Sequence, residues 1–165
     1  MGSGSSGPYG SSGGGGSQPY APTYHVDSVM HERDVTNGIY HDGHYDKNPT
    51  AQNINDMING NYIGNKNTNI DMPYVIDLNG NIILGRRNGN GRDGLPTPHP
   101  TLIGGKDPQV QMAGIVHIHG GKIASYDNQS GHFKPNAKSM EVADEAFGKL
   151  PSILFKKKKP AKKNQ

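Results

Sequence analysis

Hydrophobic residues are concentrated between positions 74 and 150, where short apolar runs alternate with turn sequences. The segments 74–77 and 81–84 are rich in Val, Ile and Leu, and the Asn-Gly dipeptide between them is the preferred turn of a tight β-hairpin. The segments 110–119 and 122–126 repeat this arrangement around a Gly-Gly turn. These patterns predict two β-hairpins.

The strand expected over 110–119 also predicts how its residues divide between the faces of a sheet. Val116 and Ile118 share one face, because side chains alternate along a strand, and Ile115, His117 and His119 share the other. We expect the first face to lie against the core and the second to point outward.

The spacing of the apolar residues changes after Asn136, a residue type common at helix N-caps. Apolar residues then recur three or four positions apart and form one stripe of a helix about four turns long, which ends at Pro151: Met140, Ala143, Phe147 and Leu150. We therefore predict an α+β fold, an antiparallel sheet of at least four strands with a C-terminal helix packed on one face.

The rest of the chain differs from this region in composition. Residues 1–24 contain eight Gly and six Ser and are expected to form a flexible linker. Residues 25–72 form an N-terminal extension with nine Asn, for which we expect turns and one short helix over 51–58. Residues 73–155 are predicted to be a compact α+β domain, and residues 156–165 a basic disordered tail.

The charge of the chain is divided between the tail and the body. The tail has six Lys and no acidic residue, which leaves 11 Lys and Arg against 14 Asp and Glu in the body. The tail is therefore a candidate for binding RNA or another anionic partner, and the simpler alternative is a solubilising terminus.

Composition also excludes several classes. The absence of Cys excludes disulfide scaffolds, thiolate metal sites and Cys nucleophiles. No segment approaches the ~20 apolar residues of a membrane span, and we expect none. The N-terminus has Gly and Ser where a signal peptide has an apolar region.

The clearest local motif is Ser130-Gly131-His132, which places a hydroxyl and an imidazole directly before the expected helix. Gly131 permits a backbone conformation that would aim the imidazole away from the sheet, and Pro135 would begin the helix. The first N–H groups of that helix could then receive a phosphate. The alternative is that His132 only holds the turn through a backbone hydrogen bond.

A second imidazole, His99, lies between two prolines that stiffen its backbone. Paired with His132, it would supply general acid and base catalysis at neutral pH. The alternative is a surface histidine in a Pro-rich loop. Four polar residues are candidates for binding substrate, the cationic ones by stabilising negative charge on an oxygen: Arg92, Lys122, Asn128 and Lys134.

Other chemistries have weaker support. The spacing of His117 and His119 would allow both to contact one metal ion, but an outward strand face explains them without one. His41 and His44 lie in an Asn-rich segment, where we do not expect fixed coordination geometry. We therefore expect no metal site. The chain also lacks a phosphate-binding loop motif and a carboxylate pair suited to glycosidase chemistry.

Four motifs together carry a resemblance to a known module: His99-Pro100-Thr101-Leu102-Ile103-Gly104-Gly105, Ala113-Gly114, Gly121-Lys122-Ile123 and Ser130-Gly131-His132-Phe133-Lys134-Pro135. Over residues 74–150 the chain resembles the C-terminal domains of bacterial polymorphic toxins, including the Rhs type. A similar core occurs in plant and fungal calmodulin-binding proteins with IQ motifs. This sequence has Pro100-Thr101 in place of two serines, Phe133 in place of tyrosine, and no IQ-like basic helix, so no calmodulin site is expected.

The resemblance implies an effector that is secreted or delivered into a target cell, after storage in the bacterial cytoplasm, with a cognate immunity protein as a candidate partner. The implied site consists of His99, Thr101, Ser130 and His132. As a metal-independent ribonuclease it would need no cofactor. As an ADP-ribosyltransferase it would use NAD as substrate, with His99 and Thr101 holding the ribose, but without the strand glutamate typical of such enzymes. The alternative is a non-catalytic binding or structural module whose Ser-Gly-His turn is architectural.

Overall fold

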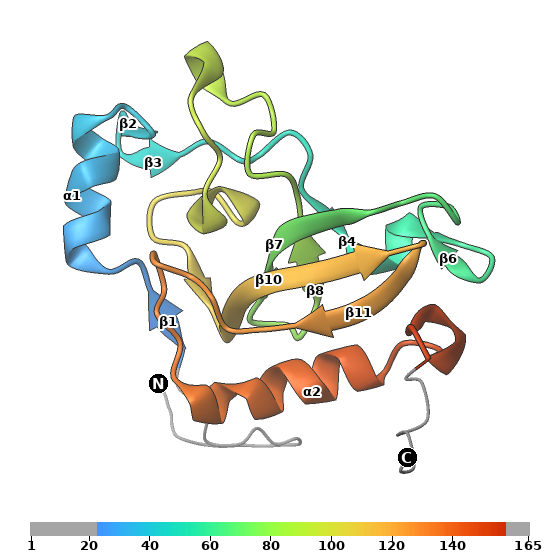
Figure 1. Ribbon diagram of the computed structural model, residues 1–165. Helices are drawn as coiled ribbons and strands as arrows, with labels where there is room; N and C mark the ends of the chain where they lie inside the picture. Colours follow the sequence, from blue (N-terminus) through green and yellow to red (C-terminus); the bar gives the residue numbers. More distant parts are fainter. Residues whose placement is uncertain (1–22, 158–165) are drawn as a thin grey trace, which may run out of the picture.

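A five-stranded antiparallel sheet forms the centre of the protein, in a computed structural model that describes residues 23–157. The strand order is β11-β10-β7-β8-β4 (Figure 1), with bounds β4 Gln52–Asn53, β7 Ile70–Ile76, β8 Ile82–Leu84, β10 Met112–His119 and β11 Lys122–Tyr126. The two predicted hairpins are β7–β8 and β10–β11, and β7 pairs with β10 over seven residue pairs to join them.

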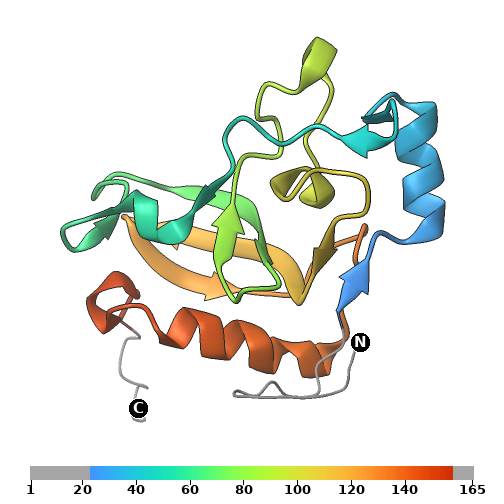
Figure 2. The ribbon, with the colours of Figure 1, turned by 180° about the vertical axis from the view of Figure 1, so that it is seen from behind.

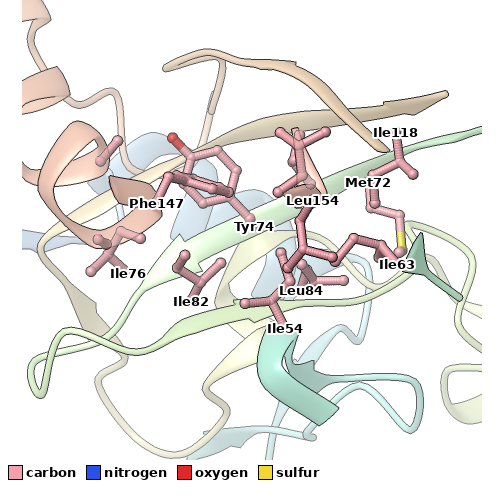
Figure 3. Close-up of a cluster of buried hydrophobic side chains, with 14 of the residues drawn as sticks. Ile54, Ile63, Met72, Tyr74, Ile76, Ile82, Leu84, Ile118, Phe147 and Leu154 are labelled. Carbon is pink, nitrogen blue, oxygen red and sulfur yellow. The ribbon is translucent and has the colours of Figure 1, made fainter. Parts of the chain in front are cut away.

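The C-terminal helix covers one face of this sheet. Helix α2 (Met140–Gly148) runs along the sheet (Figure 1) and follows the 3-10 helix η4 (Ala137–Ser139). It contributes Ala143 and Phe147 to the larger core, and a further 3-10 helix, η5 (Ser152–Leu154), contributes Leu154. Figure 3 shows Phe147 beside Tyr74 of the sheet, and Leu154 in the same buried cluster as Ile76 and Ile118. The predicted α+β fold is therefore confirmed.

The helix begins later than the sequence suggested. Asn136 is a cap, but it caps η4, where its side chain accepts a hydrogen bond from Ser139 N. Pro135 precedes this turn, and the α-helix itself starts at Met140. The expectation that Pro135 begins the helix next to the Ser-Gly-His turn is wrong, because a capped 3-10 turn intervenes.

Irregular segments cover the opposite face (Figure 2). The 3-10 helix η3 (His99–Leu102) packs Leu102 against Val75 and Ala113 of the sheet, together with Phe133. The short ladder of β1 (Tyr24–His25) and β9 (Gln109–Val110) closes this side. A second, smaller core therefore lies under the segment that contains His99.

The N-terminal segment folds with the core. It contains helix α1 (Ser28–Thr36), the hairpin of β2 (Tyr40–His41) and β3 (His44–Tyr45), and the hairpin of β5 (Ile58–Asn59) and β6 (Tyr62–Ile63). Strand β4 joins the central sheet, and β7 crosses the boundary expected near residue 72. The short helix expected over 51–58 is instead β4, the 3-10 helix η1 (Ile54–Met57) and the start of β5, because strand pairing with β8 takes its first residues.

Among residues 23–157, no helix has the length and apolar character needed to span a membrane. The predicted linker and basic tail lie largely outside these residues.

Candidate functional site

A carboxylate is buried between helix α1 and the turn that carries His132. Asp34 is the only buried residue of α1, with 3% of its surface exposed. Its Oδ2 accepts a hydrogen bond of 2.6 Å from the Tyr45 hydroxyl. His132 Nε2 lies 3.0 Å from the same oxygen and 3.2 Å from Oδ1. Because a buried carboxylate is unfavourable unless it is paired, these two partners explain how Asp34 is accommodated.

Polar contacts hold α1 in the position that brings Asp34 to this turn. Asp27 caps the helix through a 3.2 Å hydrogen bond from Met30 N, and the backbone N–H of Asp27 donates to the His132 carbonyl at 2.7 Å. Asp34 follows about two helical turns later and so faces the same turn. Burial of apolar side chains contributes little to the attachment of α1, since Val29 and Val35 are 62% and 50% exposed.

The turn itself fixes the backbone of His132. Ser130 Oγ accepts a 3.2 Å hydrogen bond from Phe133 N, the Ser130 carbonyl accepts one of 2.8 Å from Lys134 N, and Phe133 is anchored in the smaller core. The expectation that Gly131 provides the unusual backbone conformation is wrong, because the positive φ of this turn, 47°, is at Lys134.

The two nitrogens of the His132 imidazole have different surroundings. Its side chain is 12% exposed, and its Nε2 faces Asp34. Among the described residues, its Nδ1 has no hydrogen-bond partner. A buried carboxylate therefore holds Nε2, whereas Nδ1 keeps its hydrogen-bonding capacity with respect to the described residues.

An aromatic cluster supports Asp34 from the other side. Tyr45 is 1% exposed and packs edge-on against Tyr40 at 4.8 Å between ring centroids. Tyr40 in turn contacts His31 of α1 at 4.5 Å. Burial, followed by the hydrogen bond to Asp34, raises the pKa of the Tyr45 phenol. Tyr45 therefore stays protonated and acts as a donor to Asp34.

His99 is close to this site but is poorly suited to acid–base catalysis. It is 3% exposed, and its Nε2 lies 2.8 Å from the Gly114 carbonyl oxygen, to which it donates. Burial lowers its pKa to about 4, and the nearby charge of His132 adds to this effect. His99 is consequently neutral at pH 7. Thr101, predicted beside it, is also buried, and its hydroxyl donates to the Pro98 carbonyl at 2.6 Å.

Two of the four residues predicted to bind substrate lie near His132. The Nζ of Lys134 is 3.5 Å from Asp27 Oδ1, and its side chain is 61% exposed. Asn128 donates from Nδ2 to the Pro135 carbonyl at 3.3 Å, which closes the loop that carries His132.

The other two lie elsewhere. Lys122 Nζ donates to the carbonyls of Asn61 and Ile153 and sits over the ring of Tyr62 in β6. Strand β6 lies at the end of the sheet away from α1 (Figure 1). Arg92, in the 3-10 helix η2 (Arg92–Gly94), donates to the Gly38 carbonyl at 2.7 Å. Each of these two cations therefore joins separate parts of the fold.

Sequence reasoning missed Asp34, Tyr45 and His31. A helix over 28–36 was not predicted, so nothing indicated that Asp34 would be buried. His117 behaves as predicted for an outward position: it lies between the carboxylates of Asp71 and Asp127 at 2.8 and 3.1 Å. Searches of protein-family models, of curated proteins and of solved structures found no match to this chain.

Proposed function

We propose that this chain is a toxin or effector enzyme domain in which His132, oriented by Asp34, transfers protons during metal-independent cleavage of RNA. The supporting observation is the buried Asp34 carboxylate against His132 Nε2, while Nδ1 has no hydrogen-bond partner among the described residues. A carboxylate that holds one nitrogen of an imidazole fixes its tautomer and leaves the other nitrogen as a base.

The reaction follows from this asymmetry. His132 Nε2–H donates to Asp34, and Nδ1 takes the proton of a ribose 2′-hydroxyl. The 2′-oxygen then forms a bond to phosphorus, and the bond from phosphorus to the 5′-oxygen breaks. The imidazolium returns the proton to that 5′-oxygen. The products are a 2′,3′-cyclic phosphate and a 5′-hydroxyl, with no change of oxidation state and no added reactant.

Lys134 is the residue best placed to stabilise charge on the phosphate. It lies two positions from His132, and its ammonium is mostly exposed beside Asp27. A cation near the phosphate oxygens stabilises the charge that develops as the new bond forms. The Lys-rich tail would add sequence-independent attraction to RNA. The same proposal includes delivery of the chain into a target cell and a cognate immunity protein that binds it.

The chief alternative is structural. The Asp34–His132 pair also attaches α1 to the core, so a non-catalytic module would retain it for stability. His99 and Thr101, which an NAD-dependent transferase would need for binding ribose, are both buried and hydrogen-bonded to backbone carbonyls. RNA is therefore the better-supported substrate.

The test is cleavage of a labelled RNA by the full chain in the presence of a chelator. His132→Gln and Asp34→Asn should each reduce the rate at least about 100-fold, the usual contribution of a general base. His119→Gln, which removes an exposed imidazole elsewhere, is the matched control. Circular dichroism must show that each variant is folded.

Three results would overturn the proposal. Cleavage by folded His132→Gln at the parent rate would exclude His132 as the base. Nicotinamide release from NAD without RNA cleavage would indicate a transferase. Inactivity of the folded parent toward both substrates would favour the binding module.

A further inference from the structure

The hairpin formed by β2 and β3 places two histidines side by side. Its turn has φ values of 52° at Asp42 and 84° at Gly43, as a two-residue hairpin turn requires. His41 is paired directly with His44, and their ring centroids are 4.9 Å apart. The tyrosines next to them face α1, so both imidazoles lie on the opposite face of the hairpin. The Asn-rich composition suggested a flexible segment, whereas the structure has a paired one.

We propose that His41, His44 and Asp46 form a binding site for a divalent transition-metal ion of the Zn²⁺ class. His41 Nε2 lies 2.8 Å from Asp46 Oδ2, and His44 Nε2 lies 3.0 Å from Asp46 Oδ1. The three ligand atoms lie within 4.8 Å of one another. Since Zn²⁺ binds nitrogen and oxygen at about 2.0–2.2 Å, shifts of less than about 1 Å would admit the ion between them.

The second nitrogen of each imidazole supports this assignment. His41 Nδ1 is 3.1 Å from the Asp42 carboxylate, and His44 Nδ1 approaches the Asp42 carbonyl at 3.5 Å. Metal-binding histidines commonly donate their other N–H to a carboxylate or a carbonyl, which fixes the tautomer and directs the lone pair toward the metal. Asp42 would perform this role for both ligands.

The contacts of His41 Nε2 provide a further argument. Arg92 Nε donates toward this atom at 3.1 Å, while Asp46 Oδ2 lies 2.8 Å away. A protonated Nε2 would oppose the Arg92 donor, and an unprotonated Nε2 would oppose the carboxylate. One of the two contacts is therefore unfavourable in either state. A cation between His41 and Asp46 would satisfy both ligands and release Arg92.

The ligand set also indicates which ions would bind. Two imidazoles and one carboxylate suit Zn²⁺, Ni²⁺ or Co²⁺ better than Mg²⁺ or Ca²⁺, which prefer oxygen. Three protein ligands leave a position for water. This inference is independent of the proposed RNA cleavage, which is assayed with chelator present.

The experiment is calorimetric titration of the full chain with Zn²⁺, after removal of any affinity tag. One ion should bind per chain, and His44→Gln should weaken binding at least about tenfold. His119→Gln, which removes an exposed imidazole near Asp71, should leave the affinity unchanged. Bound Co²⁺ should give a visible absorption band that His44→Gln abolishes.

Arg92→Gln provides a second test, because Arg92 Nε lies 3.5 Å from Asp46 Oδ2 and this cation would compete with the metal ion for the carboxylate. The variant should bind Zn²⁺ several-fold more tightly than the parent, whereas adventitious surface binding would not respond in this way. Three results would overturn the proposal: no heat of binding in the folded parent, equal affinity in His44→Gln, or a loss of affinity in His119→Gln.

Discussion

Burial of a neutral imidazole at His99 should make the stability of the protein fall in mild acid. The folded protein holds the pKa of His99 at about 4, against an ordinary histidine value of 6.5. The neutral form is favoured because burial of the ring lowers the pKa by more than the hydrogen bond to the Gly114 carbonyl raises it. The difference between the two pKa values corresponds to about 3 kcal/mol.

The direction of this pH effect on stability follows from which state binds the proton. Between pH 6.5 and about 4 the unfolded chain protonates at His99 and the folded chain does not, so protons favour unfolding. The stability that the fold gains from keeping His99 neutral is complete above pH 6.5 and is lost as the pH falls toward 4. Lowering the pH from 7 to 5 should therefore reduce the free energy of unfolding by about 2 kcal/mol through protonation of His99 in the unfolded chain.

The assay is urea unfolding, followed by circular dichroism, of the parent and of His99→Gln at pH 7 and pH 5. The Gln amide can still donate to the Gly114 carbonyl but does not titrate. The loss of stability on acidification should be about 2 kcal/mol smaller in the variant. Other titrating groups are common to both chains and cancel in this comparison.

His117→Gln is a control of opposite sign. Burial lowers the His117 pKa, but hydrogen bonds to Asp71 and Asp127 outweigh burial and raise it. His117 therefore stabilises the fold below its ordinary pKa, and its removal should increase the loss on acidification. Equal pH dependence in His99→Gln and the parent would refute the interpretation of His99 as a buried neutral group.

Three further substitutions test the packing by their effect on the free energy of unfolding, measured in urea. Phe147→Ala should cost about 3–5 kcal/mol, because the ring is fully buried and stacks on Tyr126, and a cost below about 1 kcal/mol would contradict the packing of α2. Gly114→Ala should lower the free energy of unfolding by about 1–3 kcal/mol, since the added methyl would overlap the Asp127 carbonyl. In Gly131→Ala the added methyl meets open space, and the free energy of unfolding should change by less than about 0.5 kcal/mol. Equal costs for the two glycines would be inconsistent with these backbone positions.

The central sheet and its helix could be predicted from the sequence because their signals are local. The Asn-Gly and Gly-Gly turns fix the two hairpins, and the alternation around Val116 predicts which side chains are buried. The apolar stripe that starts at Met140 likewise identifies the helix, although α2 ends at Gly148, before Leu150. Each of these features depends on residues within a few positions of one another.

The candidate site could be predicted only in part, because it depends on distant contacts. His132 stands out by its turn, but its partner Asp34 is 98 positions away and lies on a helix with little apolar character. The prolines on either side of His99 predict a stiff backbone, but the burial of its side chain follows from packing of η3 on the sheet, which no local pattern shows. The Arg92 and Lys122 contacts are likewise long-range, so their cations were assigned to substrate from charge alone.

The central claim is that His132 makes this chain an RNA-cleaving toxin. The most direct measurement is induction of the full chain in bacteria, with growth and RNA integrity followed in the same cultures. We expect the parent to arrest growth and to produce RNA fragments with 2′,3′-cyclic phosphate ends. Folded His132→Gln at equal abundance should do neither. Intact RNA and normal growth with abundant, folded parent would contradict the claim, as would equal arrest by the parent and His132→Gln.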